Sequence, residues 1–427
     1  MVKLGKSIDK NIKTVYYYKL TEAYALKGVV VIISGKMIKL TQSNSVIRAM
    51  FEEGARLAQL HGRENVYDFS IGNPNFPAPD AVRVAIIDIA ANEDPVALHG
   101  YMPNAGFPEV RSQIADWLNG RFDTSFDNSN IIMSSGAAGA LNVAFKTLLN
   151  PGDEVVAIAP YFVEYGNYAQ NYDATLVTAR ANADDFQPDP DSLRSAVTPK
   201  TKIVILNSPN NPTGAVYSED TIKKLAAVLS EKEREYGAPI YIVSDEPYRE
   251  LAYDGAKVPF LTKYYKNTIV CYSWSKSLSL PGERIGYIVI PSEAHDYNLI
   301  FDAACIATRV LGIVNAPALL QKTVAKCLNE KADIKAYDTN RKLLYNSLKD
   351  CGFEPSLPQG AFYMWVKVPC DDKEFAETAK KYNILLVPGT SFAYPGYVRI
   401  AYCVSKKTIE NSIPAFKKLA KELGVST

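Results

Sequence analysis

The stretch Thr268-Ile269-Val270-Cys271-Tyr272-Ser273-Trp274-Ser275-Lys276 joins an apolar, β-branched run to a short polar segment. Its first five residues are typical of a strand buried on both faces of a parallel sheet. In open α/β sheets the ligand site lies just beyond the carboxyl ends of such strands. Lys276 therefore occupies a position where small molecules bind, and Pro281-Gly282-Glu283-Arg284 adds an arginine nearby. A lysine in a serine-rich loop is also a common surface charge, so the other strand ends decide between these interpretations.

The same pattern recurs from about Ser45 onward, where helical periodicity alternates with short apolar runs. This alternation predicts an α/β fold with a mainly parallel sheet covered by helices on both faces. The predicted strands are residues 154–159, 202–207, 239–244, 268–272 and 285–290. The predicted helices include residues 46–61, 140–149, 218–236 and 316–330. Mixed segments at 361–368 and 398–403 predict a smaller α+β domain.

The charge balance of this 427-residue chain differs from that of nucleic-acid-binding proteins. It carries 47 Lys and Arg against 46 Asp and Glu, so it lacks the basic field that nucleic-acid binding usually requires. Its length allows two or three domains and a large core. We therefore expect small-molecule partners, and we expect neither nucleic acid nor a membrane as a partner.

The six cysteines are scattered singly, without a Cys-x-x-Cys pair or a Cys/His cluster. This spacing argues against a disulfide framework and against a zinc site, so we expect no metal and a reduced, cytoplasmic protein. Residues 1–36 are basic and tyrosine-rich, and their apolar run at 29–33 is too short for a signal-peptide core or a membrane span. We interpret them as an atypical extension, with Met37 as a candidate for the true start.

Two segments predict contacts with a phosphorylated, flat ligand. Ser134-Ser135-Gly136-Ala137-Ala138-Gly139 precedes an apolar helix, and small residues there let backbone amides approach an anion at the positive end of the helix dipole. Ala159-Pro160-Tyr161-Phe162 follows a strand, where an aromatic ring can stack on a heteroaromatic one. Taken alone, the first segment also fits a plain loop and the second a core aromatic.

Two further strand ends carry polar side chains. Asn207-Ser208-Pro209-Asn210-Asn211-Pro212-Thr213-Gly214 predicts a turn that can hold an unusual peptide geometry. Asp245-Glu246-Pro247-Tyr248 places a carboxylate at the ligand edge of the sheet with a phenol three residues on, although a helix cap is the commoner role of an isolated aspartate there. A single bound cofactor explains all of these segments together.

The order and wording of these motifs resemble the fold-type-I, class I/II aminotransferases, which use pyridoxal 5'-phosphate (PLP), most closely the bacterial aspartate aminotransferase-like members. The resemblance covers roughly residues 45–420. It implies a large PLP-binding domain with a mainly parallel, seven-stranded sheet between helices, and a smaller α+β domain. Its implied boundaries are an arm and part of the small domain at 37–85, the large domain at 86–311 and the small domain at 312–427.

The resemblance also implies roles for individual residues. Lys276 would form the Schiff base with the cofactor and later carry the proton, and Asp245 would pair with the pyridine nitrogen. Tyr248 and Asn211 would hydrogen-bond the 3'-oxygen of the ring. The face of the ring would stack on Phe162. The phosphate would be held by the following residues: Ala137, Ala138, Ser273, Ser275 and Arg284.

Three more matches concern substrate and assembly. Val398-Arg399-Ile400-Ala401 resembles the segment whose arginine binds the substrate α-carboxylate in a bidentate contact, a pairing that lysine cannot reproduce. Phe69-Ser70-Ile71-Gly72-Asn73-Pro74 resembles the loop that closes over the substrate, with the glycine backbone near its carboxylate. His99-Gly100-Tyr101 resembles the segment whose tyrosine reaches the phosphate in the neighbouring subunit, which implies a homodimer with shared sites.

The resemblance leaves the substrate open. Aspartate with 2-oxoglutarate ranks first in a ping-pong reaction, although some aspartate-using relatives carry a lysine where this chain has Ala138. Alanine or aromatic amino acids are alternatives, and the same fold supports β-elimination from cysteine conjugates or cystathionine, as well as amino-acid decarboxylation. A transcription regulator on this fold would need an N-terminal winged-helix domain, for which 36 residues are too few.

Overall fold

The computed structural model describes residues 33–42 and 46–425, so most of the predicted 1–36 extension lies outside the described residues. The chain divides into two compact units, one ending at Ala49 and the other running from Met50 onward. In the first, α2 spans Gly35–Gln42, and α3, Val46–His61, begins there and continues into the second. All the strands of the described residues lie in the second unit.

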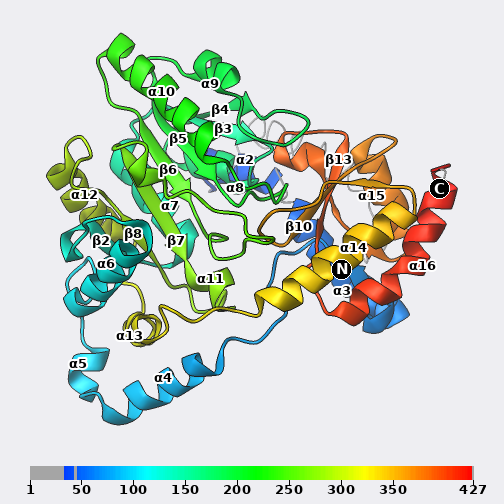
Figure 1. Cartoon of the computed structure of the whole chain (residues 1–427), viewed down its shortest axis with the longest axis horizontal. Coiled ribbons are helices and arrows are strands. Elements are labelled where there is room, and N and C mark those ends of the chain that lie inside the picture. The colour runs from blue at the N-terminus through cyan, green and yellow to red at the C-terminus, as the bar shows by residue number, and fades with distance from the viewer. Residues whose placement is uncertain (1–32, 43–45, 426–427) are drawn as a thin grey trace, which may run out of the picture. The chain divides into compact units, whose positions relative to one another are not determined.

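A seven-stranded sheet, here called the large sheet, dominates the described part of this unit (Figure 1). Its order is β2-β8-β7-β6-β5-β3-β4, and only β8 runs antiparallel to its neighbours. The strands are β2 (Ile131–Ser134), β3 (Glu154–Ala159), β4 (Thr175–Arg180), β5 (Thr201–Asn207), β6 (Tyr241–Asp245), β7 (Thr268–Ser273) and β8 (Gly286–Val289). The predicted α/β class and mainly parallel sheet are confirmed.

Alternation within the strands buries both faces of the large sheet. Val155 packs with α7 and α8, whereas the next residue, Val156, packs with α9 and α10. Two consecutive apolar side chains in a strand point to opposite faces, so a continuous apolar run is stable only between two helical layers. These and the other helices beside this sheet are α4 (Asp80–Asn92), α5 (Pro95–His99), α6 (Pro108–Phe122), α7 (Gly136–Leu148), α8 (Glu164–Asn171), α9 (Pro190–Ala196), α10 (Glu219–Tyr236), α11 (Trp274–Ser277), α12 (Tyr297–Val310) and α13 (Ala318–Lys326).

A second, four-stranded antiparallel sheet, here called the small sheet, has the order β12-β13-β10-β9. Its strands are β9 (Glu354–Pro355), β10 (Tyr363–Lys367), β12 (Val387–Pro388) and β13 (Tyr397–Ala401). Its helices are α14 (Ile334–Asp350), α15 (Asp372–Lys380) and α16 (Lys406–Glu422), which Figure 1 shows grouped around it. A separate core cluster joins these helices to β10 and β13. The short pair of β1 (Tyr67–Asp68) and β11 (Ile384–Leu385) ties the segment before Gly72 to this region.

Most predicted strands lie within a residue or two of their observed bounds. The predicted helix 316–330 is shorter, since α13 ends at Lys326. The expected unusual geometry after β5 is present, because the Ser208–Pro209 peptide is cis. In the described residues, no helix combines the length and apolarity needed to cross a membrane.

Candidate active site

The carboxyl ends of three neighbouring strands bring the central residues together. Asn207, the last residue of β5, lies opposite Asp245, the last residue of β6, and Asp245 lies opposite Cys271 on β7. The Asn207 amide donates to the Asp245 backbone carbonyl over 2.8 Å and accepts from the Asn211 backbone N–H over 2.7 Å. Asn207 therefore fixes both the carboxylate-bearing strand end and the turn that carries Asn211.

Lys276 follows β7, on the short helix α11. Ser273 caps this helix, its side-chain oxygen accepting from the Ser275 backbone N–H. Its Nζ donates to the carbonyl oxygen of Gly72 over 2.6 Å. Burial lowers the pKa of Lys276 to about 8, and the positive charges of Arg284 and Arg399 act in the same direction. A buried ammonium is costly, so the neutral amine that can act as nucleophile or base is within reach near neutral pH.

Asp245 is buried, and its two carboxylate oxygens differ. Oδ2 accepts a 2.6 Å hydrogen bond from the hydroxyl of Tyr165, whereas Oδ1 has no hydrogen-bond partner among the described residues. Burial raises the pKa of Asp245 to about 7, and the bond from Tyr165 opposes this rise. A buried carboxylate oxygen without a partner is costly and indicates a site for a donor group.

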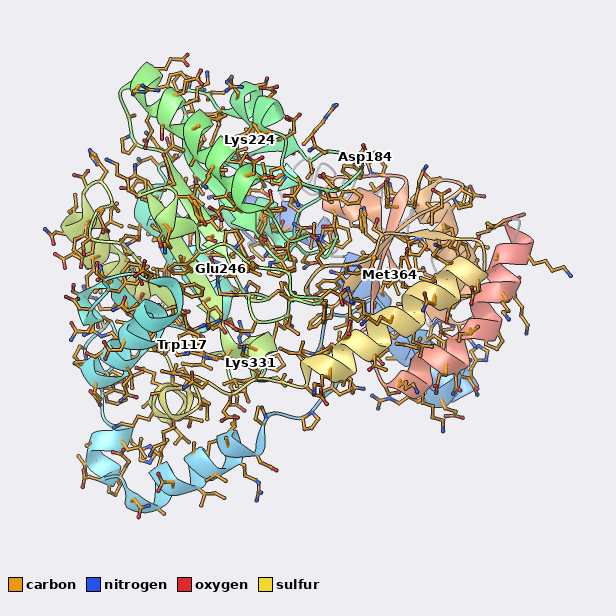
Figure 2. The ribbon with its side chains drawn as sticks, viewed as in Figure 1. Trp117, Asp184, Lys224, Glu246, Lys331 and Met364 are labelled. Carbon is orange, nitrogen blue, oxygen red and sulfur yellow. The ribbon has the colours of Figure 1, made fainter. Side chains whose placement is uncertain are left out.

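Tyr248 lies beside Asp245 at the start of the next segment. Its hydroxyl is 2.8 Å from that of Tyr363 on β10, so this contact joins the large sheet to the small one. Figure 2 labels Glu246 and Met364, the chain neighbours of Asp245 and Tyr363, on these two parts of the molecule. Burial raises the pKa of Tyr248 well above its usual range, so its phenol remains a hydrogen-bond donor.

An anion cradle, here defined as Gly136, Ala137, Ser273, Ser275 and Arg284, forms where α7 begins. Gly136 has φ 70°, and a Cβ there would lie 2.8 Å from Nη2 of Arg284. The Oγ atoms of Ser273 and Ser275 are 2.7 Å apart. Ala137 follows Gly136 in the first helical turn, whose backbone N–H groups lack intrahelical acceptors. Hydroxyls, a guanidinium and a helix N-terminus together suit a phosphate.

Arg399 lies at the other side of Asn211. This arginine is 1% exposed; its Nη1 donates to Asn211 Oδ1 over 3.0 Å and its Nη2 to the Ser70 carbonyl over 2.6 Å. Its Nε has no hydrogen-bond partner among the described residues. The guanidinium lies over the rings of Tyr363 and Phe392, and these contacts restrict its orientation. Since no carboxylate in the described part of the chain pairs with this buried arginine, it suits a carboxylate ligand.

The structure thus brings most of the predicted site residues into one region. The remaining three, Phe162, Ala138 and Tyr101, differ in how they relate to it. Phe162 contacts Tyr165, the hydrogen-bond partner of Asp245, edge to face with ring centroids 5.7 Å apart. Ala138 follows the cradle residues on α7. Tyr101 is 96% exposed, and within the described residues it makes no contact with the site of its own chain.

Four residues at this site carried no prediction of their own. Tyr165, Tyr363, Ser70 and Cys403 contact Asp245, Tyr248, Arg399 and the Ile71 carbonyl respectively. All lie inside or next to segments already quoted, and Tyr165 stands three residues after Phe162 at the start of α8. Their partners are distant in sequence, so no local pattern could have paired them.

The chain is similar to known proteins over the whole of this region. The model of the family described as aminotransferase class I and II matches residues 64–416, which include every site residue named above. An aspartate aminotransferase from Pyrococcus horikoshii is 31% identical over 395 residues, covering 89% of this chain and 94% of that enzyme. A solved aminotransferase from Eubacterium rectale has a TM-score of 0.90 and 48% identity, covering 92% of this chain and all of that one. An aspartate aminotransferase from Thermus thermophilus, solved with maleate, has a TM-score of 0.80 and 27% identity, covering 91% of this chain and all of that one.

Proposed function

Because the chain belongs to the class I and II aminotransferase family and is a PLP-dependent transaminase, we propose that it transfers the amino group of L-aspartate to 2-oxoglutarate in a ping-pong reaction. The observation that supports the transaminase chemistry is the convergence of Lys276, Asp245 and Arg399. Arg399 bonds Asn211, which Asn207 joins to the Asp245 backbone. Lys276 bonds the carbonyl of Gly72. A half-buried amine, a buried carboxylate and a buried arginine meet there, each suited to a different part of a cofactor with its substrate.

The side chains present fit PLP. Lys276 would hold it covalently, and Asp245 Oδ1, which lacks a partner among the described residues, would accept from its ring nitrogen. Tyr248 and Asn211 would contact the ring oxygen, Phe162 would stack on the ring, and the cradle with Ala138 would bind the phosphate. When bound, PLP supplies an aldehyde that condenses with amines and a ring that accepts the electrons left at the substrate Cα.

The proton transfers would be carried out by Lys276. With a pKa lowered to about 8, a substantial fraction of its Nζ is neutral near pH 7.5. The neutral Nζ would accept the proton from the substrate Cα and deliver it to the carbon on the far side of the substrate nitrogen, two atoms away. Gly72, whose carbonyl accepts from Nζ, would keep the amine at the substrate side of the site. Asp245, ionised, would keep the ring nitrogen protonated.

Substrate binding would depend on Arg399. Two rings and two protein acceptors restrict the orientation of its guanidinium. A guanidinium fixed in this way would suit a bidentate contact with the α-carboxylate that every amino acid shares. The preference for aspartate rests on the names of the Pyrococcus horikoshii and Thermus thermophilus relatives. Ala138 argues the other way, because it supplies no charge for a second carboxylate, so alanine or an aromatic amino acid is the second candidate.

Assembly as a homodimer with shared sites is part of the same proposal. Tyr101, 96% exposed, is a large side chain that residues 33–42 and 46–425 leave uncovered. More than half-exposed apolar side chains also stand on α4, α5 and α12, and a second copy would cover them. They are Val84, Ile87, Val96, Leu299 and Val310. Sedimentation equilibrium should give twice the chain mass of 47.1 kDa, and a monomer would contradict the shared site.

The substrate assignment is tested by half-reactions. Holoenzyme is mixed with single amino acids in the absence of an oxo acid, and loss of the PLP absorbance is recorded for each. Aspartate should give the highest rate constant per concentration. A higher value for alanine or an aromatic amino acid would replace aspartate, and pyruvate with ammonia formed from cystathionine without an oxo acid would favour β-elimination.

A further inference from the structure

The hydroxyl of Tyr165 makes the one hydrogen bond that the described residues give to the Asp245 carboxylate. Tyr165 is 1% exposed and donates to Oδ2 over 2.6 Å, and Oδ1 remains without a partner. A carboxylate can rotate about its terminal torsion, whose preference is broad. Holding one oxygen therefore decides where the other oxygen points.

On the basis of the proposed function, we propose that Tyr165 is a positioning residue for the reaction: it fixes Asp245 so that Oδ1 meets the cofactor's ring nitrogen, and it holds the carboxylate ionised. An ionised Asp245 leaves the shared proton on the ring nitrogen, which makes the ring an electron acceptor. A protonated Asp245 would leave the ring nitrogen neutral and weaken that ability.

Tyr165 is built to stay in place. Its ring belongs to the apolar cluster between the large sheet and helices α7, α8 and α12. Phe162 meets it edge to face at 5.7 Å, and its backbone N–H bonds the Phe162 carbonyl over 3.2 Å. Because Phe162 is also the proposed ring stacker, one short segment would set both the plane of the cofactor and the direction of Asp245.

The charges around Asp245 make this bond necessary. The pKa of Asp245 is raised to about 7: burial raises it, the Tyr165 hydrogen bond opposes that rise, and the charge of the nearby Glu246 adds a smaller increase. The other titratable groups that face Asp245 are Tyr168, Tyr248 and Cys271, all neutral, since burial raises the pKa of each. The pKa of Tyr165 itself lies well above its usual range because of burial, so it remains a neutral donor at every working pH.

The test compares two cofactors in Tyr165→Phe. Fluorescence titration of the apo-protein gives its affinity for PLP and for the PLP analogue in which carbon replaces the ring nitrogen. A hydrogen bond to a charged group is worth ~1.5–3 kcal/mol, so we expect the PLP affinity to fall about 10-fold or more. The affinity for the analogue, which has no nitrogen to pair, should stay within about twofold by the same reasoning.

Two controls distinguish positioning from folding. Tyr168→Phe removes the same atom from the same helix, where no described hydrogen bond to Asp245 exists, and it should change neither affinity. On an Asp245→Asn background, Tyr165→Phe should also change neither, because the amide carries no charge to hold. This pair of backgrounds keeps the test usable if Tyr165→Phe alone folds poorly.

Each outcome decides. A selective loss of PLP affinity supports the inference. Equal losses for PLP and the analogue, or no loss for either, would overturn it while leaving the proposed transaminase intact, provided that the unaltered protein binds PLP more tightly than the analogue. If the unaltered protein bound no PLP, the proposed function and this inference would fall together.

Discussion

Arg399→Lys examines the proposed contact with the substrate α-carboxylate. In the structure Nη1 and Nη2 of Arg399 bond Asn211 and the Ser70 carbonyl, and the guanidinium lies 4.4 Å from the Tyr363 ring centroid. Lysine keeps the charge but cannot present two parallel N–H groups. At least one charge-assisted hydrogen bond to the substrate is then lost, which is worth ~1.5–3 kcal/mol, or roughly 10- to 150-fold in kcat/KM.

The assay measures the first half-reaction with aspartate, alanine, an aromatic amino acid and a simple primary amine that lacks a carboxylate. The kcat/KM should fall by a similar factor for all three amino acids, and it should not fall for the simple amine. Arg341→Lys is the matched control: Arg341 is equally buried at 1% exposed, but it pairs with Asp254 and Asp338 away from the site. That variant should lose stability while keeping the relative rates of the four amines. A loss confined to one amino acid, or an equal loss for the simple amine, would refute the reasoning.

Three other outcomes follow from the same geometry. Gly72→Ala would place a Cβ 1.9 Å from the Tyr363 hydroxyl, so chemical denaturation should show ~1–3 kcal/mol of destabilisation together with weaker amino-acid binding. The control Gly120→Ala has open space around its Cβ and should not destabilise the protein. Unchanged stability in Gly72→Ala would contradict the contact with Tyr363. Ala138→Lys should raise kcat/KM for aspartate relative to alanine, and an unchanged ratio would remove Ala138 as a specificity position. Burial lowers the pKa of Lys276 from 10.5 to about 8, so between these pH values the unfolded apo-protein binds more protons than the folded one. The free energy of unfolding should therefore rise with pH in this range, and Lys276→Met should remove that rise. Equal slopes of unfolding free energy against pH in the two proteins would show that Lys276 is not buried as described.

The sequence predicted most of the strands whose two faces are both buried. Residues 154–159 form a continuous apolar run, and β3 occupies the same residues. β4, Thr175–Arg180, escaped prediction because it lies at the edge of the sheet with several side chains exposed, so its run is polar in part. β2, Ile131–Ser134, is only four residues long and passes directly into the turn before α7, which obscured it.

The candidate site was predictable to the extent that its residues follow strand ends. Asp245 is the last residue of β6 and Lys276 stands just beyond β7, and the parallel order of these strands brings their ends together. Tyr165 and Tyr363 reach the site through tertiary contacts with partners 80 and 115 residues away. Those pairings depend on how α8 and the small sheet pack, which the local pattern does not specify.

The most direct test of the central claim is borohydride reduction of the holoenzyme followed by peptide mass spectrometry. The account predicts that the pyridoxyl phosphate mass is found on Lys276, and that Lys276→Ala neither gains this mass nor transaminates at a measurable rate. Attachment to another lysine, or full transamination by Lys276→Ala, would contradict it.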